Sequence, residues 1–208
     1  MKGRSLIGFG VSLAILWTGS LPVFAQSQRY LTNVELQRMR QQFRQVIESN
    51  RQNEASANYI RDRRTPAERQ KIQSFVGAWS KVDPAVAPFL GSWSGYEEVS
   101  HIYPSNVKGR VCIIVTGEGS GGFSLGSVSN EQIRTPDGQV IFKQGNYLGR
   151  AVFQNNKPKL IDIIPANNPQ SLEPVQRISS YIRDSQVKNV IIQQFKAAGC
   201  TASPPNQR

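Results

Sequence analysis

The sequence predicts an α+β fold in which two N-terminal helices precede an antiparallel β-meander, and a C-terminal helix follows. Apolar residues recur at helical spacing before residue 84 and again near the end of the chain, whereas short β-rich segments lie between them. Glycine, proline and asparagine separate these segments, as turns do between neighbouring strands. The meander is expected to form a curled sheet or a small barrel. The predicted divisions are residues 1–25, 26–84, 85–200 and 201–208.

The first 25 residues have the order of a secretory signal peptide. The basic residues Lys2 and Arg4 precede an apolar stretch from Leu6 to Trp17, and Pro22 interrupts the segment before Ala25. We expect cleavage after Ala25, which would leave a periplasmic or secreted protein. The alternative is a retained membrane anchor, because an apolar segment of this length could almost cross a bilayer.

Two capping boxes mark the starts of the N-terminal helices. Thr32 stands three residues before Glu35, and Thr65 stands three residues before Glu68, with Pro66 at the first helical position. Each segment continues with apolar residues at every third or fourth position, which gives each helix an apolar face. Because a polar link joins them, we expect an antiparallel pair that packs on itself and on the sheet, or on another protein.

The middle of the chain reads as strands and tight turns. Val111–Val115 is aliphatic and mostly β-branched, which is typical of a buried strand. Pro136-Asp137-Gly138 and Asn155-Asn156-Lys157-Pro158 predict turns between neighbouring strands. The C-terminal helix follows, with Val187, Ile191, Phe195 and Ala198 on one face and Gly199 as its C-cap. The tail from Thr201 onward is expected to be loose.

Cys112 and Cys200 are the only cysteines, and both lie in the part that would be exported. An even pair in an oxidising compartment predicts a disulfide, which would join the buried strand to the end of the last helix. Closing so long a loop would stabilise the fold by about 4 kcal/mol. The alternative is two separate buried thiols.

The charge of the chain points to an anionic partner. The sequence has 25 Lys and Arg against 14 Asp and Glu, for a formal net charge of +11. An exported basic protein rarely meets nucleic acid, so we expect an anionic envelope component or an acidic protein, with peripheral membrane contact as one form. With one His and two Cys, no metal site and no cofactor are expected. The oligomeric state is left open.

Arginine is the prevailing basic residue in the N-terminal helices and in their link. Its guanidinium binds phosphate or carboxylate through paired hydrogen bonds, whereas lysine acts as a point charge, so this choice favours a binding surface. The alternative is a solvated helix face on which acidic neighbours pair with the arginines. The predicted surface consists of Arg40, Arg44, Arg51, Arg61, Arg63, Arg64 and Arg69.

Two patterns suggest chemistry, and for both we favour a structural interpretation. The segment from Gly117 to Gly122 matches the dinucleotide-binding pattern G-x-G-x-x-G, but a strand rather than a helix follows, so we expect a hairpin loop. Glu97, Glu98 and His101 are the nearest approach to an acid–base or metal cluster. Without a further ligand, nucleophile or orienting group nearby, we expect a solvated strand face with an exposed histidine, and no catalytic residue.

Gly91-Ser92-Trp93 resembles the G-x-W motif that opens the first strand of lipocalin-like barrels. That resemblance implies a Trp that packs across the closed end of a barrel, and a lumen that binds a small apolar molecule. The segments Phe89–Glu98, Ile102–Ser105 and Gly145–Gly149 resemble exported cyanobacterial proteins of unknown function, which implies no activity.

We therefore predict an exported, non-catalytic binding or structural module of the cell envelope, which contacts an anionic partner through its arginine-rich helices. The alternative function is a lipocalin-like carrier of a small apolar ligand, with Trp93 and Tyr96 in the ligand pocket. A closed barrel with an apolar lumen would favour the carrier. A filled core beside an exposed arginine stripe would favour the interaction module.

Overall fold

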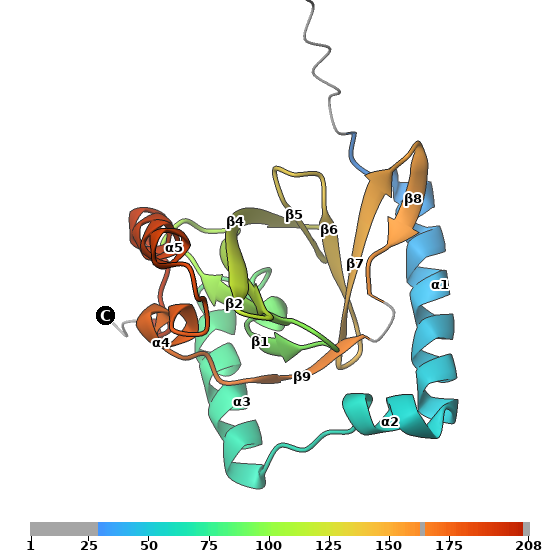
Figure 1. Cartoon of the computed structure of the whole chain (residues 1–208), viewed down its shortest axis with the longest axis horizontal. Helices are drawn as coiled ribbons and strands as arrows, with labels where there is room; N and C mark the ends of the chain where they lie inside the picture. Colours follow the sequence, from blue (N-terminus) through green and yellow to red (C-terminus); the bar gives the residue numbers. More distant parts are fainter. Residues whose placement is uncertain (1–28, 163–164, 206–208) are drawn as a thin grey trace, which may run out of the picture.

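The computed structural model describes residues 29–162 and 165–205, and the predicted cleavage after Ala25 lies outside them. The fold is α+β, as predicted (Figure 1). The helices are α1 (Asn33–Gln52), α2 (Glu54–Ile60), α3 (Pro66–Ser80), the short 3-10 helix η1 (Ala87–Phe89), α4 (Val175–Ser179) and α5 (Ser185–Ala197). The strands are β1 (Gly91–Ser94), β2 (Val99–Pro104), β3 (Arg110–Gly117), β4 (Ser120–Ser129), β5 (Gln132–Arg134), β6 (Val140–Gln144), β7 (Tyr147–Gln154), β8 (Lys157–Leu160) and β9 (Ala166–Gln170).

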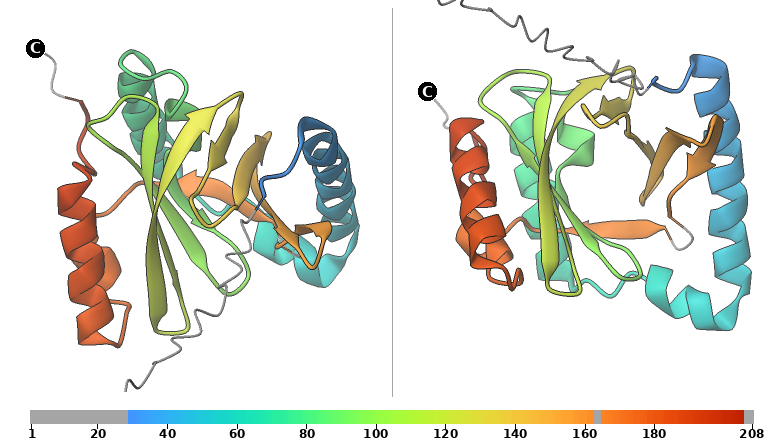
Figure 2. Two further views of the ribbon diagram at one scale, coloured as in Figure 1. Left: turned by 90° about the horizontal axis from the view of Figure 1, so that it is seen from above. Right: turned by 45° about the horizontal axis from the view of Figure 1, so that its top comes forward.

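The strands of the described residues form one antiparallel sheet that closes into a barrel. Consecutive strands from β1 to β7 pair with each other, and β9 lies between β1 and β7 and completes the ring. β8 stands outside this ring as a hairpin partner of β7. Of the two predicted arrangements, the structure therefore has the barrel (Figure 2).

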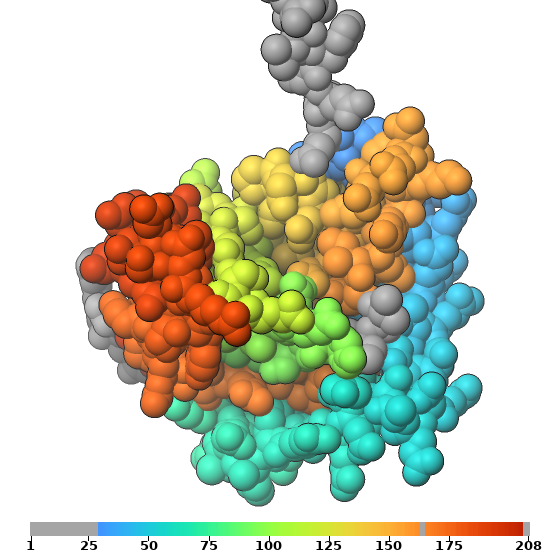
Figure 3. All heavy atoms as spheres, viewed as in Figure 1, coloured from blue at the N-terminus to red at the C-terminus, as the bar shows by residue number. Residues whose placement is uncertain are grey.

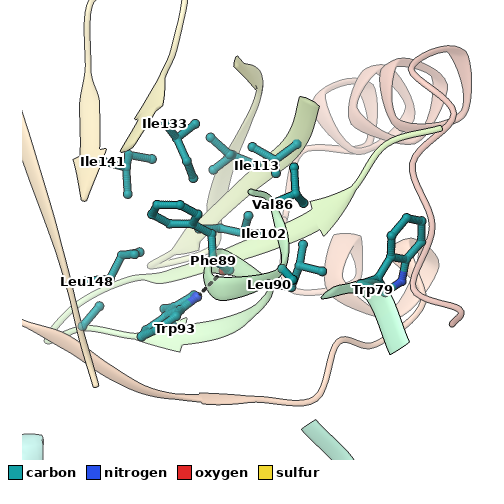
Figure 4. Packing of buried hydrophobic residues seen from close by; sticks show 13 residues of the cluster. Trp79, Val86, Phe89, Leu90, Trp93, Ile102, Ile113, Ile133, Ile141 and Leu148 are labelled. Atoms are coloured by element: carbon teal, nitrogen blue, oxygen red, sulfur yellow. Dashed lines mark hydrogen bonds between the residues drawn. The ribbon is translucent and has the colours of Figure 1, made fainter. Parts of the chain in front are cut away.

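The core of the molecule fills the inside of the barrel (Figure 4). Trp93 of β1, Ile102 of β2 and Leu148 of β7 are each at most 1% exposed. Phe89 of η1 points in among them, and its carbonyl oxygen accepts a hydrogen bond of 2.7 Å from the Trp93 indole N–H. A ring of this size leaves room for little beyond such side chains.

The helices cover the barrel on separate sides. α1 packs outside β6 and β7, where the rings of Phe43 and Phe142 meet edge to face at 5.3 Å. α4 and α5 pack outside β2 and β3 on the far side, and α3 lies below, next to η1 (Figures 1 and 2). The expected antiparallel packing of the two N-terminal helices is therefore wrong. Each helix instead finds its apolar partner on a different part of the barrel.

The predicted hairpin turns are present. Glu118 and Gly119 join β3 to β4 with φ angles of 49° and 82°, and Asn155 and Asn156 join β7 to β8 with 50° and 59°. A two-residue hairpin loop of type I′ needs a positive φ at both positions, which glycine and asparagine tolerate best. The glycine-rich segment after β3 is thus a hairpin loop, and the strand β4 follows it.

Both N-terminal helices begin where the sequence predicts. Thr32 and Thr65 make both hydrogen bonds of a capping box, with Glu35 and Glu68. The link between them is not wholly irregular, because Asn53 caps the short helix α2. This helix is not predicted from the sequence, since about two turns carry too little apolar periodicity to be recognised.

The disulfide between Cys112 and Cys200 is present and ties β3 to the chain shortly after the end of α5. The C-cap of α5 is Ala198 rather than the predicted Gly199, which follows it with a φ of 62°, the left-handed conformation that often ends a helix. The tail is not loose at its start, because the Ser203 carbonyl oxygen accepts a hydrogen bond of 3.2 Å from the Trp79 indole N–H.

Candidate functional site

The structure divides the predicted arginine surface between two parts of the molecule. Three of the arginines lie on α1, along β6 and β7, and the others lie in the link after α2 and at the start of α3. The first group is Arg40, Arg44 and Arg51, and the second is Arg61, Arg63, Arg64 and Arg69. The two groups therefore do not form one continuous stripe on a helix face.

Arg40 is part of the protein's own packing. It is half-buried, and its guanidinium donates hydrogen bonds to the carbonyl oxygens of Lys143 at 3.2 Å and Glu131 at 3.0 Å. The same group lies 5.0 Å from the centre of the Phe142 ring. Burial lowers the pKa of Arg40. Its charge is thus used to hold α1 on the barrel.

The other two arginines of the first group, Arg44 and Arg51, are exposed. Arg51 donates a hydrogen bond of 3.1 Å to Glu48, and its guanidinium lies 5.6 Å from the centre of the Tyr147 ring. Arg44 and Arg51 both line a hollow beside the β6–β7 turn. Because Glu48 already partners one of them, this group offers a weaker positive surface than the sequence suggests.

Three members of the second group, Arg61, Arg63 and Arg64, line a polar hollow of about 750 Å³ between the link, β1 and β9. Arg69 lies outside its lining and donates a hydrogen bond of 2.7 Å to the Arg64 carbonyl oxygen. Arg61 and Arg63 are exposed at its edge, and the surface below them carries hydroxyl and amide groups. We call this hollow the arginine hollow. Its lining includes Arg61, Arg63, Arg64, Glu68, Asn58, Ser94, Asn167, Asn168 and Gln170.

Arg64 builds this hollow rather than facing a ligand. Its Nε lies 2.9 Å from Asp62 Oδ1, and its Nη1 donates to the carbonyl oxygen of Pro169 in β9 at 2.8 Å. Hydrogen bonding to Arg64 lowers the pKa of the Asp62 carboxyl to about 2. The link is thereby fixed on the barrel, and Arg61 and Arg63, which stand on either side of Asp62 in the chain, are held at the edge of the hollow. Among the described side chains, none forms an ion pair with either of these two.

The residues that were expected to share a ligand pocket are separated. Trp93 is fully buried inside the barrel, whereas Tyr96 is 55% exposed in the β1–β2 turn. Tyr96 instead packs edge to face on Tyr59 of α2, with ring centres 5.2 Å apart. Tyr59 also lines the arginine hollow, so this exposed aromatic pair stands at its border.

His101 is buried, which corrects the expected exposed histidine. Its side chain points outward from β2, where Ser92 Oγ lies 2.8 Å from Nδ1 and Thr116 Oγ1 lies 3.2 Å from Nε2. Burial lowers the pKa of His101 to about 4, so the imidazole is neutral at neutral pH. Sequence reasoning missed both hydroxyl partners, although Ser92 stands directly opposite His101 in the β1–β2 pairing.

The chemistry available to this cluster is hydrogen bonding between neutral groups. Ser92 and His101 resemble a nucleophile and a base, but the second ring nitrogen faces the hydroxyl of Thr116, where a hydrolase triad has a carboxylate. The partners expected beside His101 lie elsewhere. Glu98 pairs with Arg150 of β7, and Glu97 is exposed.

A second charged site lies at the mouth of the barrel, opposite η1. Arg150 points from β7 into the mouth, pairs with Glu98, and contacts Asp162 Oδ1 at 2.6 Å. Burial raises the pKa of Asp162, although the neighbouring Arg150 opposes the shift. Beside this network is a hollow of about 710 Å³, which we call the mouth hollow.

Comparisons with protein-family models, with curated proteins and with solved structures give no match to this chain. Among the described helices, none is both long and apolar enough to cross a bilayer.

Proposed function

We propose that the protein is an exported, non-catalytic binding module of the cell envelope, and that it contacts an anionic partner through the arginine hollow. The observation that carries the proposal is the placement of Arg61 and Arg63 at the rim of a polar hollow that Arg64 holds rigid. Guanidinium and amide donors together suit carboxylate or phosphate oxygens, which accept several hydrogen bonds at once.

The predicted arginines differ in how far their charges are available to a partner. Arg40 and Arg64 already bond to carbonyl oxygens of the barrel, so their charges are partly used in folding. Arg61 and Arg63 keep exposed guanidinium groups, and within the described residues Arg63 makes a single side-chain hydrogen bond, to the Asn58 carbonyl oxygen at 3.0 Å. These two side chains can therefore turn to a ligand at little cost to the fold. The Cys112–Cys200 disulfide also supports an oxidising compartment.

Replacing Arg61 and Arg63 with glutamine is expected to weaken binding to phosphatidylglycerol vesicles about 10- to 30-fold. Each basic residue near an anionic surface contributes about 1 kcal/mol, and both exposed guanidinium groups of the hollow are lost. Vesicle co-sedimentation at about 50 mM salt measures the change, and binding should fall further as the Debye length shortens. Vesicles of phosphatidylcholine should not bind.

The matched control replaces Arg177 and Lys196 with glutamine. Arg177 lies on α4 and Lys196 on α5, away from the link that carries Arg61 and Arg63, and the change in net charge is the same (Figure 1). If the control loses as much binding as the Arg61 and Arg63 variant, only net charge matters and the hollow is not the site.

A lipocalin-like carrier is the second candidate, because the sheet closes into a barrel with Trp93 inside it. The interior beside η1 is filled with side chains, so a small apolar ligand would have to bind in the mouth hollow. A carrier should bind the apolar dye Nile red at one saturable site, independently of Arg61 and Arg63. Unsaturable partitioning of the dye would contradict this candidate.

A further inference from the structure

β4 is paired very unequally along its two edges. On one edge it pairs with β3 from Ser120 to Ser127, without a break. On the other edge it pairs with β5 only through Ser127–Ser129. Within the part of the chain that the structure describes, the segment Ser120–Gly126 therefore has a neighbouring strand on one side only. In Figure 3 this part of β4 lies at the surface of the face that is viewed.

The alternation of an antiparallel ladder identifies the backbone groups at the open edge. The Val128 N–H donates to the Gly109 carbonyl oxygen at 2.7 Å, so the even-numbered residues of β4 direct their backbone groups toward β3. The odd-numbered residues direct theirs the other way. The N–H and C=O groups of Gly121, Phe123 and Leu125 thus face the open edge.

The helix α5 and Ile182 pack against the outer face of β4, but two common means of protecting the edge itself are absent. The segment Ser120–Gly126 contains no charged residue and no proline, which are common means of blocking strand addition. Gly121 and Gly122 line the mouth hollow, and a Cβ atom on Gly122 would meet nothing within 4 Å. The hollow of about 710 Å³ therefore gives an extended chain room to approach the backbone.

The charges around the mouth hollow indicate the kind of chain that fits. Its lining includes four carboxylates and one guanidinium. That guanidinium, on Arg150, is already bonded to two of the carboxylates. The other two, on Glu97 and Glu118, form no ion pair with any described residue. The carboxylates are those of Glu97, Glu98, Glu118 and Asp162.

We propose that the open edge of β4 binds an extended segment of a partner protein that carries basic side chains, as an added β-strand. Main-chain hydrogen bonds to Gly121, Phe123 and Leu125 would supply the affinity, and the carboxylates of the mouth hollow would select lysine or arginine. This surface is distinct from the arginine hollow and takes a partner of the opposite charge, so it does not depend on the function proposed above.

A fluorescent peptide of alternating valine and lysine, about seven residues long, tests the proposal by anisotropy titration. Three outcomes are expected. The parent peptide binds, and a peptide with glutamate in place of lysine does not bind. A peptide with N-methyl groups on alternate amides binds about tenfold more weakly or worse, since it keeps the charge but loses the main-chain donors. Failure of the parent peptide to bind, or equal binding of the methylated peptide, would overturn the proposal.

Amide exchange and one variant locate the site. On binding of the parent peptide, the amide protons of Gly121, Phe123 and Leu125 should become protected in NMR exchange spectra. Gly122→Phe should weaken binding about tenfold or more by filling the hollow. The control Gly77→Phe, on α3 and also in open space, should bind normally. Unprotected amides, or full binding by Gly122→Phe, would show that the peptide binds elsewhere and would sink the proposal.

Discussion

Replacing Cys112 and Cys200 with alanine is expected to lower the free energy of unfolding by about 4–5 kcal/mol. The bridge closes a loop of 88 residues, and cross-linking so distant residues removes much of the conformational freedom of the unfolded chain. A loss of this size is a large part of the total stability of an ordinary domain. Urea denaturation at neutral pH measures it, with the oxidised parent protein as the reference.

The loss should also be uneven across the structure. α5 keeps other contacts to the barrel, including the edge-to-face pair of Phe195 and Tyr103, with ring centres 4.9 Å apart. The bridge nevertheless joins the end of α5 to β3, so its removal should loosen α5 more than β6 and β7, and we expect faster amide exchange in α5. Cys200→Ala alone should have nearly the same effect as the double replacement. Two titratable thiols in the unreduced, denatured parent would contradict the bridge itself.

The parts of the fold that the sequence predicts are those that local interactions determine. Capping boxes at Thr32 and Thr65 need only residues within one turn, and the hairpin at Asn155-Asn156 needs only two positive φ angles. The strand at Val111–Val115 follows from its β-branched residues. Each of these signals is complete within a few residues of the chain.

The closure of the barrel could not be predicted because the strand that completes it has no strand signal. β9 has the sequence Ala-Asn-Asn-Pro-Gln, which is typical of a loop, and Asn168 has a φ of 42°. It is a strand because β1 and β7 supply backbone partners on its two sides. Likewise, the apolar face of α1 does not reveal whether its partner is α3 or the barrel.

The candidate site was predicted in part, for a related reason. The abundance of arginine in the link is enough to predict Arg61 and Arg63 as binding residues, and both side chains are exposed in the structure. The same reasoning gives Arg40 and Arg64 an equal role, because their burial depends on strands more than 90 residues further along the chain. His101 was expected on a solvated face because β2 was assumed to have one. Both faces of β2 are covered, one by the barrel core and the other by α4 and α5.

Lowering the pH from about 6.5 to about 4 is expected to cost about 3 kcal/mol of stability through His101 alone. In the folded protein burial lowers the pKa of His101 to about 4, whereas the unfolded chain has an ordinary value near 6.5. Between these values the unfolded state binds the proton and the folded state does not, so acid favours unfolding. Stability from this source is complete above about pH 6.5.

Because the sequence contains one histidine, its signal can be followed without assignment ambiguity. The imidazole resonances should not titrate between about pH 5 and 8 in the folded protein, and should titrate near pH 6.5 in urea. The hydrogen bond from Arg29 lowers the pKa of the Glu35 carboxyl to about 2. Such carboxyls therefore lose their stabilising charge mostly below the pH range in which His101 takes up its proton in the unfolded chain.

His101→Gln provides the control that isolates this effect. Glutamine can still hydrogen-bond to Ser92 or Thr116 but does not titrate, so its stability should vary little between about pH 5 and 7 even if it is lower throughout. Every other titrating group, including Asp162, is common to both proteins, and the difference between the two pH profiles therefore belongs to His101. Parallel profiles would mean that the folded histidine takes up its proton near pH 6.5, which is incompatible with a buried, neutral ring between two hydroxyl groups.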